Sequence, residues 1–319
     1  MKRHLLFLAA LLIVNLAASA QKKFSVYAVG FYNQENLFDT CHDEGKKDYE
    51  YLPNKGWNGM KYTNKLRNMS KALADMGTDV LPNVGCAFIG LAEVENHKVL
   101  DALVDQAPLK ARNMKYVHIE GPDRRGIDCA LLYNPSLFSV KNVKLLPYVQ
   151  ELAKDSAFFT RGFLTVRGEM AGDDVAVIVC HWPSRFSGPF YRESAARQVK
   201  VIKDSLLNVN QEMKIFVMGD MNDDPVNKSM HVYLQAKPEI SQVGAGDMYN
   251  PWYNVLAKEG KGTLFYSGNW NLFDQIVITP NLLNKDAKKK DYSSLKYWKS
   301  HIFRRDYLIQ QEGQYKGAP

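Results

Sequence analysis

The sequence predicts a single α/β domain built on mixed β-sheets. Short apolar runs bounded by polar residues, typical of buried strands, alternate with segments whose apolar residues recur at helical spacing. The chain has 319 residues, of which 46% are hydrophobic, so it can form one large core or at most two small ones. No internal repeat or interdomain linker interrupts the pattern, which favours one domain after the N-terminal segment.

In the first half of the chain, hydrophobic spacing predicts strands and helices around a long polar loop. Leu66, Met69 and Leu73 recur at helical intervals and give one helix an apolar face. In chain order, the predicted elements are a strand at 24–31, a loop at 41–58, a helix at 61–76, a strand at 86–92, a helix at 97–106, a turn at 121–126 and a strand at 127–133.

The second half begins with two apolar runs around the turn 171–174, which predict a β-hairpin. A helix with Ala195, Val199 and Ile202 on one face follows, and then a buried strand that is followed directly by Gly219. In chain order, the predicted elements are strands at 163–169 and 175–180, a helix at 191–207, a strand at 215–218 and a final strand at 271–279.

Polar residues that can bind ligands gather at the ends of these strands. In layered α/β proteins the carboxyl ends of the strands are where ligands and catalysis gather. Taken singly, the residues have ordinary explanations: Asn36 could cap a segment, Glu93 could be a surface carboxylate, and His181 could be a satisfied buried histidine. Asp274 lies inside an apolar strand and needs a partner if it is buried. The strand-end residues are Asn36, Glu93, His181, Asp220 and Asn222.

This set of residues fits metal-assisted hydrolysis of phosphoesters. Oxygen ligands with few thiols or histidines suit Mg²⁺, Mn²⁺ or Ca²⁺ rather than zinc. Such an ion polarises a phosphoryl oxygen and stabilises the charge of an in-line attack. A nearby aspartate can orient or deprotonate the attacking water, and a histidine can donate to the phosphate.

Residues 1–20 have the pattern of a secretory signal peptide. Lys2 and Arg3 precede an apolar block, and small residues at 18–20 form a cleavage site before Gln21. The apolar block is short for a membrane span, so an uncleaved anchor is the weaker interpretation. The sequence therefore predicts a secreted or periplasmic protein without stable membrane insertion after cleavage.

The net charge and the cysteine content constrain the predicted substrate and the disulfide state less strongly. The formal net charge is +7, and cleavage of the signal would lower it by two. A mild positive balance suits an anionic substrate but is also common on ordinary solvated surfaces. Four cysteines in an exported chain could form two disulfides, yet Cys86, Cys129 and Cys180 lie in or beside apolar runs. We therefore expect buried free thiols.

Six motifs in a fixed order resemble the endonuclease/exonuclease/phosphatase superfamily, which includes deoxyribonuclease I, exonuclease III and the inositol polyphosphate phosphatases. The similarity extends from about Phe24 to Thr279. It implies a four-layered α/β sandwich of two packed mixed β-sheets, with the site at one rim, formed by residues 21–319. The motifs are Asn-Leu near the start, Leu-Ala-Glu-Val-Glu-Asn, Arg-Gly-Ile-Asp, His-Trp-Pro-Ser-Arg, Gly-Asp-Met-Asn-Asp and Phe-Asp-Gln-Ile.

The resemblance also implies roles for the residues that match the motifs. Glu93 would be the principal ligand of a divalent metal, with Asn36 in the same metal pocket. Asp220 would orient or deprotonate the attacking water, and Asn222 would hold phosphate or water. His181 would contact the scissile phosphate.

Further matches concern the substrate side of the site. Arg185 would lie close behind the histidine, and Arg125 and Asp128 would line the substrate-binding surface. Asp274 corresponds to the family aspartate that holds a final catalytic histidine.

The sequence departs from the family pattern at its end. The family closes with Ser-Asp-His before an apolar strand, whereas this chain offers only Ser300-His301. We therefore expect a domain that is C-terminally incomplete, in which Asp274 has lost its partner. The competing interpretation is that His301 folds back to Asp274 and serves instead.

Together these observations predict a secreted, Mg²⁺-dependent phosphodiester hydrolase, most simply a monomeric endonuclease acting on nucleic acid. A phosphatase or a phospholipid phosphodiesterase would share the same metal chemistry, because a fold does not choose its substrate. A catalytically impaired protein that only binds phosphate ligands is the alternative from another class.

Overall fold

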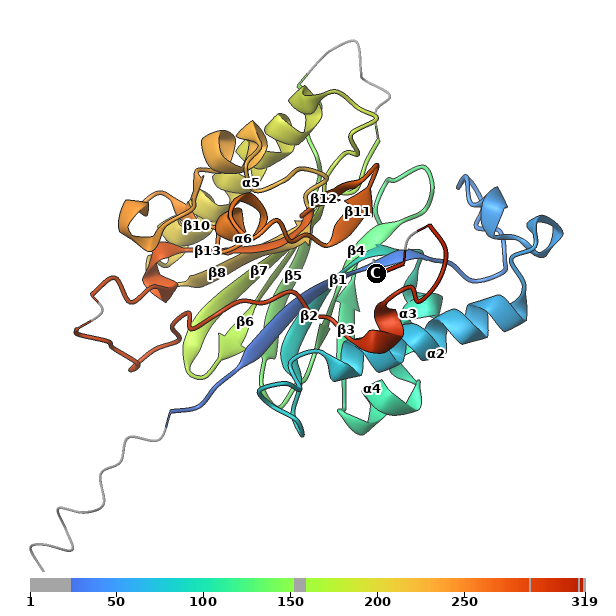
Figure 1. Cartoon of the computed structure of the whole chain (residues 1–319), viewed down its shortest axis with the longest axis horizontal. Helices are drawn as coiled ribbons and strands as arrows, with labels where there is room; N and C mark the ends of the chain where they lie inside the picture. The colour runs from blue at the N-terminus through green and yellow to red at the C-terminus, as the bar shows by residue number, and fades with distance from the viewer. Residues whose placement is uncertain (1–23, 152–158, 287, 315, 318–319) are drawn as a thin grey trace, which may run out of the picture.

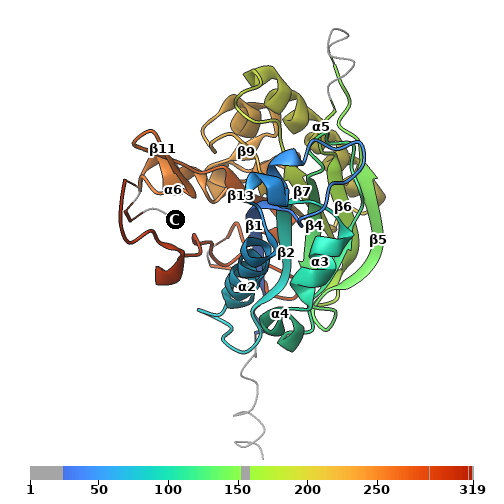
Figure 2. The same cartoon turned by 90° about the vertical axis from the view of Figure 1, so that its right-hand side faces the viewer.

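Two β-sheets pack face to face, and helices cover the outer face of each sheet (Figures 1 and 2). The computed structural model describes residues 24–151, 159–286, 288–314 and 316–317, and every structural statement below refers to these ranges. Figure 1 shows α5 on one side of the strands and α2, α3 and α4 on the other. The predicted four-layered α/β sandwich is confirmed.

The first sheet has the strand order β1-β2-β4-β3. The first two strands run parallel, and β4 is antiparallel to both of its neighbours. Helices α2 to α4 cover this sheet and bury a shared apolar cluster against it. The elements are β1 (Ala28–Leu37), α2 (Gly59–Asp75), β2 (Cys86–Val94), α3 (His97–Val104), α4 (Ala107–Ala111), β3 (Lys115–His118) and β4 (Asp128–Tyr133).

The second sheet has the order β5-β6-β7-β8-β13-β10-β9, with β7 and β8 parallel and β13 antiparallel to β8. The long helix α5 and the π-helical turn η4 (Ser229–Tyr233) cover its outer face. The elements are β5 (Ser139–Leu146), β6 (Phe163–Met170), β7 (Asp173–His181), α5 (Pro189–Val209), β8 (Lys214–Asp220), β9 (Ala236–Lys237), β10 (Met248–Tyr249), α6 (Tyr253–Ala257) and β13 (Asp274–Ile278). A separate hairpin pairs β11 (Leu264–Tyr266) with β12 (Asn269–Asn271).

The main core lies between the two sheets. Phe88 of β2 contacts Phe216 of β8 edge to face, with ring centroids 5.5 Å apart. Strands β7 and β8 are buried along nearly their whole length, since one face meets the first sheet and the other meets α5. Burial on both faces explains why these strands read as continuous apolar runs. Their carboxyl ends place His181 and Asp220 side by side.

The structure corrects several predicted boundaries. The first strand starts at Ala28 and continues to Leu37, beyond the predicted 24–31, so the polar run after Phe31 is part of the sheet. The predicted helix at 97–106 ends at Val104. Strand β5 was not predicted because it is an edge strand in which no side chain is fully buried. The predicted signal peptide lies outside the described residues.

The described cysteines are all free thiols, and Cys86, Cys129 and Cys180 are buried in the core as predicted. Cys41, by contrast, is exposed. In the described ranges no helix combines the length and apolarity needed to span a bilayer.

Gly219 allows β7 and β8 to approach closely beside the site. A Cβ atom at this position would overlap the carbonyl oxygen of Cys180 on the neighbouring strand. We expect Gly219→Ala to lower the free energy of unfolding by about 3 kcal/mol, the upper part of the range for overpacked positions, because backbone must move. Gly246→Ala is the control, since no atom of the described residues lies within 4 Å of its Cβ position. Equal urea midpoints for the two variants would contradict this explanation.

Candidate active site

Glu93 and Asn36 lie opposite each other at a β-bulge between β1 and β2. The pairing is regular from Val29 to Asn33 and resumes at Leu37, which leaves residues 34–36 opposite Glu93 alone. Asn36 and Glu93 both adopt left-handed backbone conformations, with φ of 62° and 60°. Such strained conformations concentrate at functional sites, and bulges redirect side chains there. The bulge thus places the backbone of Asn36 opposite that of Glu93 at the end of the first sheet, although only Glu93 lines the cleft described below.

Asp220 ends β8 and is held by two hydrogen bonds. The side-chain amide of Asn33 donates to Oδ2 at 3.0 Å, and the backbone N–H of Asn222 donates to Oδ1 at 2.8 Å. Burial, followed by the nearby Glu93 carboxylate, raises the pKa of Asp220 to about 6. The carboxylate is therefore fixed in position, ionised at neutral pH and more basic than an exposed aspartate.

His181 ends β7 and lies between the two carboxylates. Its Nε2 atom is 3.6 Å from Oε1 of Glu93 and 3.9 Å from Oδ2 of Asp220. Burial, together with the cationic Arg161 and Arg125, holds the pKa of His181 well below its usual range, so the ring is neutral at pH 7. The Nδ1 atom is buried and has no hydrogen-bond partner among the described residues.

A polar cleft of about 280 Å³ opens at this edge of the second sheet. Five of the residues predicted from the sequence line it: Glu93, Arg125, His181, Asp220 and Asn222. The cleft also includes Phe159, Thr160, Arg161, Pro183, Ser184 and Ser187, which were not predicted as site residues. The carboxyl ends of β2, β7 and β8 therefore meet at one site, as the positions of the motifs indicated.

Two polar groups of the cleft wall, besides His181, are buried without partners in the described structure. They are Oγ1 of Thr160 and Nε of Arg161. Buried polar atoms are almost always hydrogen-bonded, because an unpaired one costs about 1–3 kcal/mol. Donor groups of this kind on the wall of a cleft fit the oxygen atoms of a bound anion.

Arg161 also joins two parts of the site. Its Nη1 atom lies 3.0 Å from Oδ2 of Asp123, and Nη2 donates to the carbonyl oxygen of Trp182 at 3.1 Å. Both charged side chains are nearly fully buried. The sequence did not indicate this role, because Arg161 lies in a segment without strand or helix periodicity.

We expect Arg161→Met to lower the free energy of unfolding by about 3–5 kcal/mol, because it leaves the Asp123 charge buried and uncompensated. Urea denaturation followed by circular dichroism measures the loss. Arg125→Met is the matched control: Arg125 is exposed and lies 4.0 Å from Asp123, an arrangement worth less than about 1 kcal/mol. A loss in the control as large as that in Arg161→Met would contradict this ranking.

Asp128 and Arg185 do not line the cleft in this structure. Oδ1 of Asp128 accepts a hydrogen bond from the N–H of Gly121, and Oδ2 lies 3.2 Å from Nε2 of His118. Arg185 donates to Oδ2 of Asp224 at 2.8 Å and to the carbonyl oxygen of Asn222 at 3.2 Å. Both side chains bind to backbone groups of segments next to the cleft. Their contact with substrate stays a prediction.

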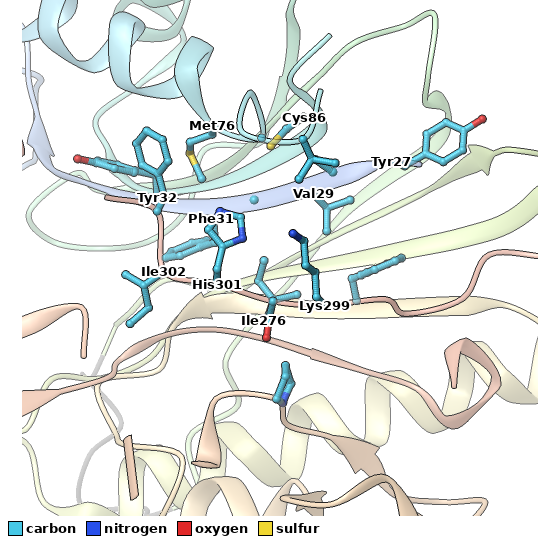
Figure 3. A pocket seen from close by; sticks show the side chains of 18 of the residues that line it. Tyr27, Val29, Phe31, Tyr32, Met76, Cys86, Ile276, Lys299, His301 and Ile302 are labelled. Carbon is cyan, nitrogen blue, oxygen red and sulfur yellow. The ribbon is translucent and has the colours of Figure 1, made fainter. Parts of the chain in front are cut away.

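Asp274 borders a different cavity. It lies opposite Asp220 in the pairing of β13 with β8, and burial, followed by the Asp220 charge, raises its pKa well above the usual range. Its side chain lines a groove of about 1280 Å³ between the edge of β1, β13 and the C-terminal segment. Figure 3 shows His301 and Lys299 pointing into this groove from that segment.

The structure does not pair His301 with Asp274. Although both line the groove, Nε2 of His301 lies 3.5 Å from Oδ2 of Asp79, beyond the end of α2. No histidine in the described ranges lies within ion-pair distance of Asp274. The predicted role of Asp274 as the support of a catalytic histidine therefore stays a prediction.

The residues at the bulge fit a divalent metal ion that prefers oxygen ligands. Oδ1 of Asn36 is buried and lacks a partner among the described residues, as a ligand atom would without its ion. A carboxylate with an amide oxygen, completed by water, is typical of Mg²⁺ sites. Glu95 fits less well: its Oε2 atom already accepts a hydrogen bond from Asp39, and burial raises its pKa to about 8.

A second group of potential ligands lies beyond the cleft. Ligand atoms of His118, Glu120 and Asp128 all lie within 4.8 Å of one another. These groups already have partners, since Asp128 is paired with His118 and Nζ of Lys46 lies 3.3 Å from Glu120. The ordinary explanation is a network that holds the turn after β3.

The comparisons with known proteins agree with the fold. A family model described as Endonuclease/Exonuclease/phosphatase family matches residues 28–319. The structure is similar to that of ANGEL2, a 2′,3′-cyclic phosphatase, with 13% identity and a TM-score of 0.52, covering 79% of this chain and 82% of that one. A search of curated proteins found no match.

Two further solved structures are similar at lower scores. The mannosyl-6-phosphatase of Bacteroides thetaiotaomicron has 13% identity and a TM-score of 0.49, covering 80% of this chain and 86% of that one. Truncated TDP2 of Caenorhabditis elegans has 16% identity and a TM-score of 0.46, covering 68% and 78%.

A four-layered sandwich with carboxylates, an imidazole and an amide at its strand ends is compatible with the hydrolysis of phosphoric esters. The chain belongs to the endonuclease/exonuclease/phosphatase family, whose members include nucleases and phosphatases. The resemblance found in the sequence is thereby confirmed.

Proposed function

We propose that this protein is a secreted, divalent-metal-dependent phosphodiester hydrolase that acts on nucleic acid as a monomer. The observation that carries the proposal is the cleft itself. It brings the carboxylates of Glu93 and Asp220 together with three buried polar groups, on Thr160, Arg161 and His181, that have no partner among the described residues. Such a cleft suits a group that carries several oxygen atoms and negative charge.

Within this proposal, Asp220 acts on the attacking water. Its two hydrogen bonds fix the carboxylate, and a pKa of about 6 leaves it ionised yet basic enough to accept a proton at pH 7 to 8. The proton moves from the water to a carboxylate oxygen of Asp220 as the oxygen–phosphorus bond forms, and the ester bond breaks with its electron pair on the leaving oxygen, which takes a proton from solvent. The neutral His181 and the guanidinium groups of Arg125 and Arg161 donate to the phosphoryl oxygens.

Glu93 and Asn36 would hold the metal, for which Mg²⁺ is the proposed ion and Mn²⁺ or Ca²⁺ are the alternatives. When bound, the ion supplies Lewis-acid polarisation of a phosphoryl oxygen. Because Oε1 of Glu93 lies 3.6 Å from Nε2 of His181, the metal ligand and the proposed phosphate donor are neighbours.

Hydrolysis of phosphomonoesters is the second candidate, and the size of the cleft favours it. A volume of about 280 Å³ is at the lower limit for small-molecule pockets and can accommodate a terminal phosphate with little else. In a diester, the two attached groups would have to lie outside the cleft, along its rim.

The test uses purified protein on plasmid DNA, RNA oligonucleotides, phosphoinositides, sphingomyelin and a phosphomonoester, each with Mg²⁺ and with EDTA. We expect EDTA-sensitive cleavage of nucleic acid. EDTA-sensitive release of phosphate from the monoester alone would establish the second candidate. If the protein binds phosphate ligands but turns over none of these substrates, the catalytically impaired binding protein would be the better description.

Export is proposed from the N-terminal sequence pattern. Expression of the full chain in a bacterial host, followed by N-terminal sequencing of the periplasmic protein, should give a chain that begins at Gln21. Recovery of an uncleaved chain with the membrane fraction would overturn the proposal.

A further inference from the structure

The loop that follows His181 forms part of the cleft wall and carries a fully exposed phenylalanine, Phe186. Pro183, Ser184 and Ser187 of this loop line the cleft, and Phe186 lies between them in the chain with its ring entirely in solvent. Single exposed apolar side chains are common on protein surfaces and by themselves mean little. The position of this one, on a loop that forms the wall of the cleft, is what requires an explanation.

The loop is rigidly held, so the exposure of Phe186 does not come from a loose segment. The buried guanidinium of Arg192 donates to the carbonyl oxygens of Ser184 at 2.9 Å and Ser187 at 3.0 Å. Nε of the same side chain lies 2.8 Å from Oδ1 of the buried Asp223. A buried ion pair therefore fixes the backbone on both sides of Phe186.

A second exposed ring lies at the cleft. Phe159 lines it and has about half of its surface exposed, and the guanidinium of Arg124 lies 5.7 Å from the centre of its ring. Arg125 follows in the chain and also lines the cleft. Exposed aromatic rings combined with guanidinium groups are characteristic of surfaces that stack nucleobases, whereas an acyl chain would make no use of the cations.

We propose that Phe186 and Phe159 bind the nucleobase of a nucleotide whose phosphate occupies the cleft, and that they thereby make this enzyme selective for nucleotide substrates over other phosphoesters. The inference rests on the proposed function in placing the phosphate in the cleft. The base would stack on the rings at the rim, outside the small polar volume that holds the phosphate. Because stacking uses the face of the base, the contact discriminates little among bases.

Calorimetric titration with Mg²⁺ present tests this proposal. Thymidine 5′-monophosphate and ribose 5-phosphate are compared, since they share the phosphate and a pentose but only one carries a base. Wild-type protein should bind the nucleotide about tenfold more tightly, within the range measured for one stacked base. Phe186→Ala should lose most of this difference and leave the affinity for ribose 5-phosphate unchanged, whereas Phe186→Trp should keep it.

Phe24→Ala is the matched control, since Phe24 is an exposed phenylalanine located before the start of β1. Its affinities should equal those of the wild type. The inference would be overturned if Phe186→Ala lost equal affinity for thymidine 5′-monophosphate and ribose 5-phosphate, or lost affinity for neither. Full retention of nucleotide affinity in Phe186→Leu, or tighter binding of dodecyl phosphate than of the nucleotide, would also overturn it, because apolar contact rather than stacking would then explain the site.

The two proposals fail separately. Base-dependent binding without EDTA-sensitive turnover would remove the proposed activity and leave the nucleobase site in place. EDTA-sensitive turnover together with equal nucleotide affinities for Phe186→Ala and wild type would remove the nucleobase site and leave the proposed activity in place.

Discussion

Glu93→Gln is expected to lower kcat/KM for phosphoester hydrolysis by about 10³-fold and to raise the concentration of Mg²⁺ needed for half-maximal activity. The substitution keeps the shape of the side chain at the bulge but removes the charge that would hold the metal. Metal stabilisation of transition-state charge is worth several kcal/mol, and about 1.4 kcal/mol corresponds to each tenfold change in rate. Calorimetric titration with Mg²⁺ measures the affinity without reference to turnover.

Glu169→Gln is the control for this prediction. Glu169 lies on β6 and pairs with Lys141 at the surface, away from the cleft, so its loss should leave rate and metal affinity unchanged. Glu95→Gln distinguishes the carboxylate of Glu93, near the end of β2, from that of Glu95, which follows the strand. Because Glu95 has its pKa raised to about 8 by burial, we expect a much smaller effect on metal affinity than in Glu93→Gln. If Glu95→Gln abolished Mg²⁺ binding and Glu93→Gln did not, the assignment of the ligand would be wrong.

Asp220→Asn is expected to lower kcat by about 10²- to 10⁴-fold, the contribution typical of a general base, and at the same time to stabilise the metal-free protein at pH 7. The second effect follows from the sign of the pKa shift. Burial raises the pKa of Asp220 to about 6, so the folded state binds this proton more tightly than the unfolded state does. The stability from this group is therefore present below about pH 4 and is lost as the pH rises to about 6.

Thermal unfolding in EDTA between pH 4 and pH 8 measures this dependence. Asp220→Asn should have a higher Tm than wild type at pH 7 and a weaker decline between pH 4 and pH 6. Asp204→Asn on α5 should instead have a lower Tm than wild type at pH 7. Burial acts to raise the pKa of Asp204, but Lys200 and Lys203 outweigh it and hold the pKa below its usual value. A lower Tm for Asp220→Asn at pH 7 would show that its carboxylate stabilises the fold.

The parts of the site that the sequence revealed are those carried by buried strands. Glu93, His181 and Asp220 each follow an apolar run, and the carboxyl ends of β2, β7 and β8 meet because β7 and β8 are parallel in one sheet and β2 packs across from them. Periodicity identifies such strands, and their ends fix the side chains that come next. The central strands and the helices α2 and α5 were predicted for the same reason.

Contacts that depend on tertiary packing could not be predicted in this way. Arg161 reaches Asp123 and the Trp182 carbonyl from a segment without periodicity, and Asn33 meets Asp220 only because the two sheets pack together. The bulge at Glu93 also shifts the pairing of β2 with β4, and the Asp128 side chain turns toward Gly121. A motif therefore located Asp128 beside the site without revealing which partner its carboxylate takes.

In the proposed mechanism, water activated at Asp220 attacks the phosphorus atom with the help of a metal held at Glu93. Hydrolysis of a dinucleotide in ¹⁸O-labelled water, analysed by mass spectrometry, tests it most directly. We predict that wild-type protein places the label in the phosphate of the product, that EDTA abolishes the reaction, and that Glu93→Gln and Asp220→Asn each reduce incorporation in proportion to their loss of rate. Label in the hydroxyl of the leaving nucleoside, or undiminished incorporation in EDTA, would contradict the claim.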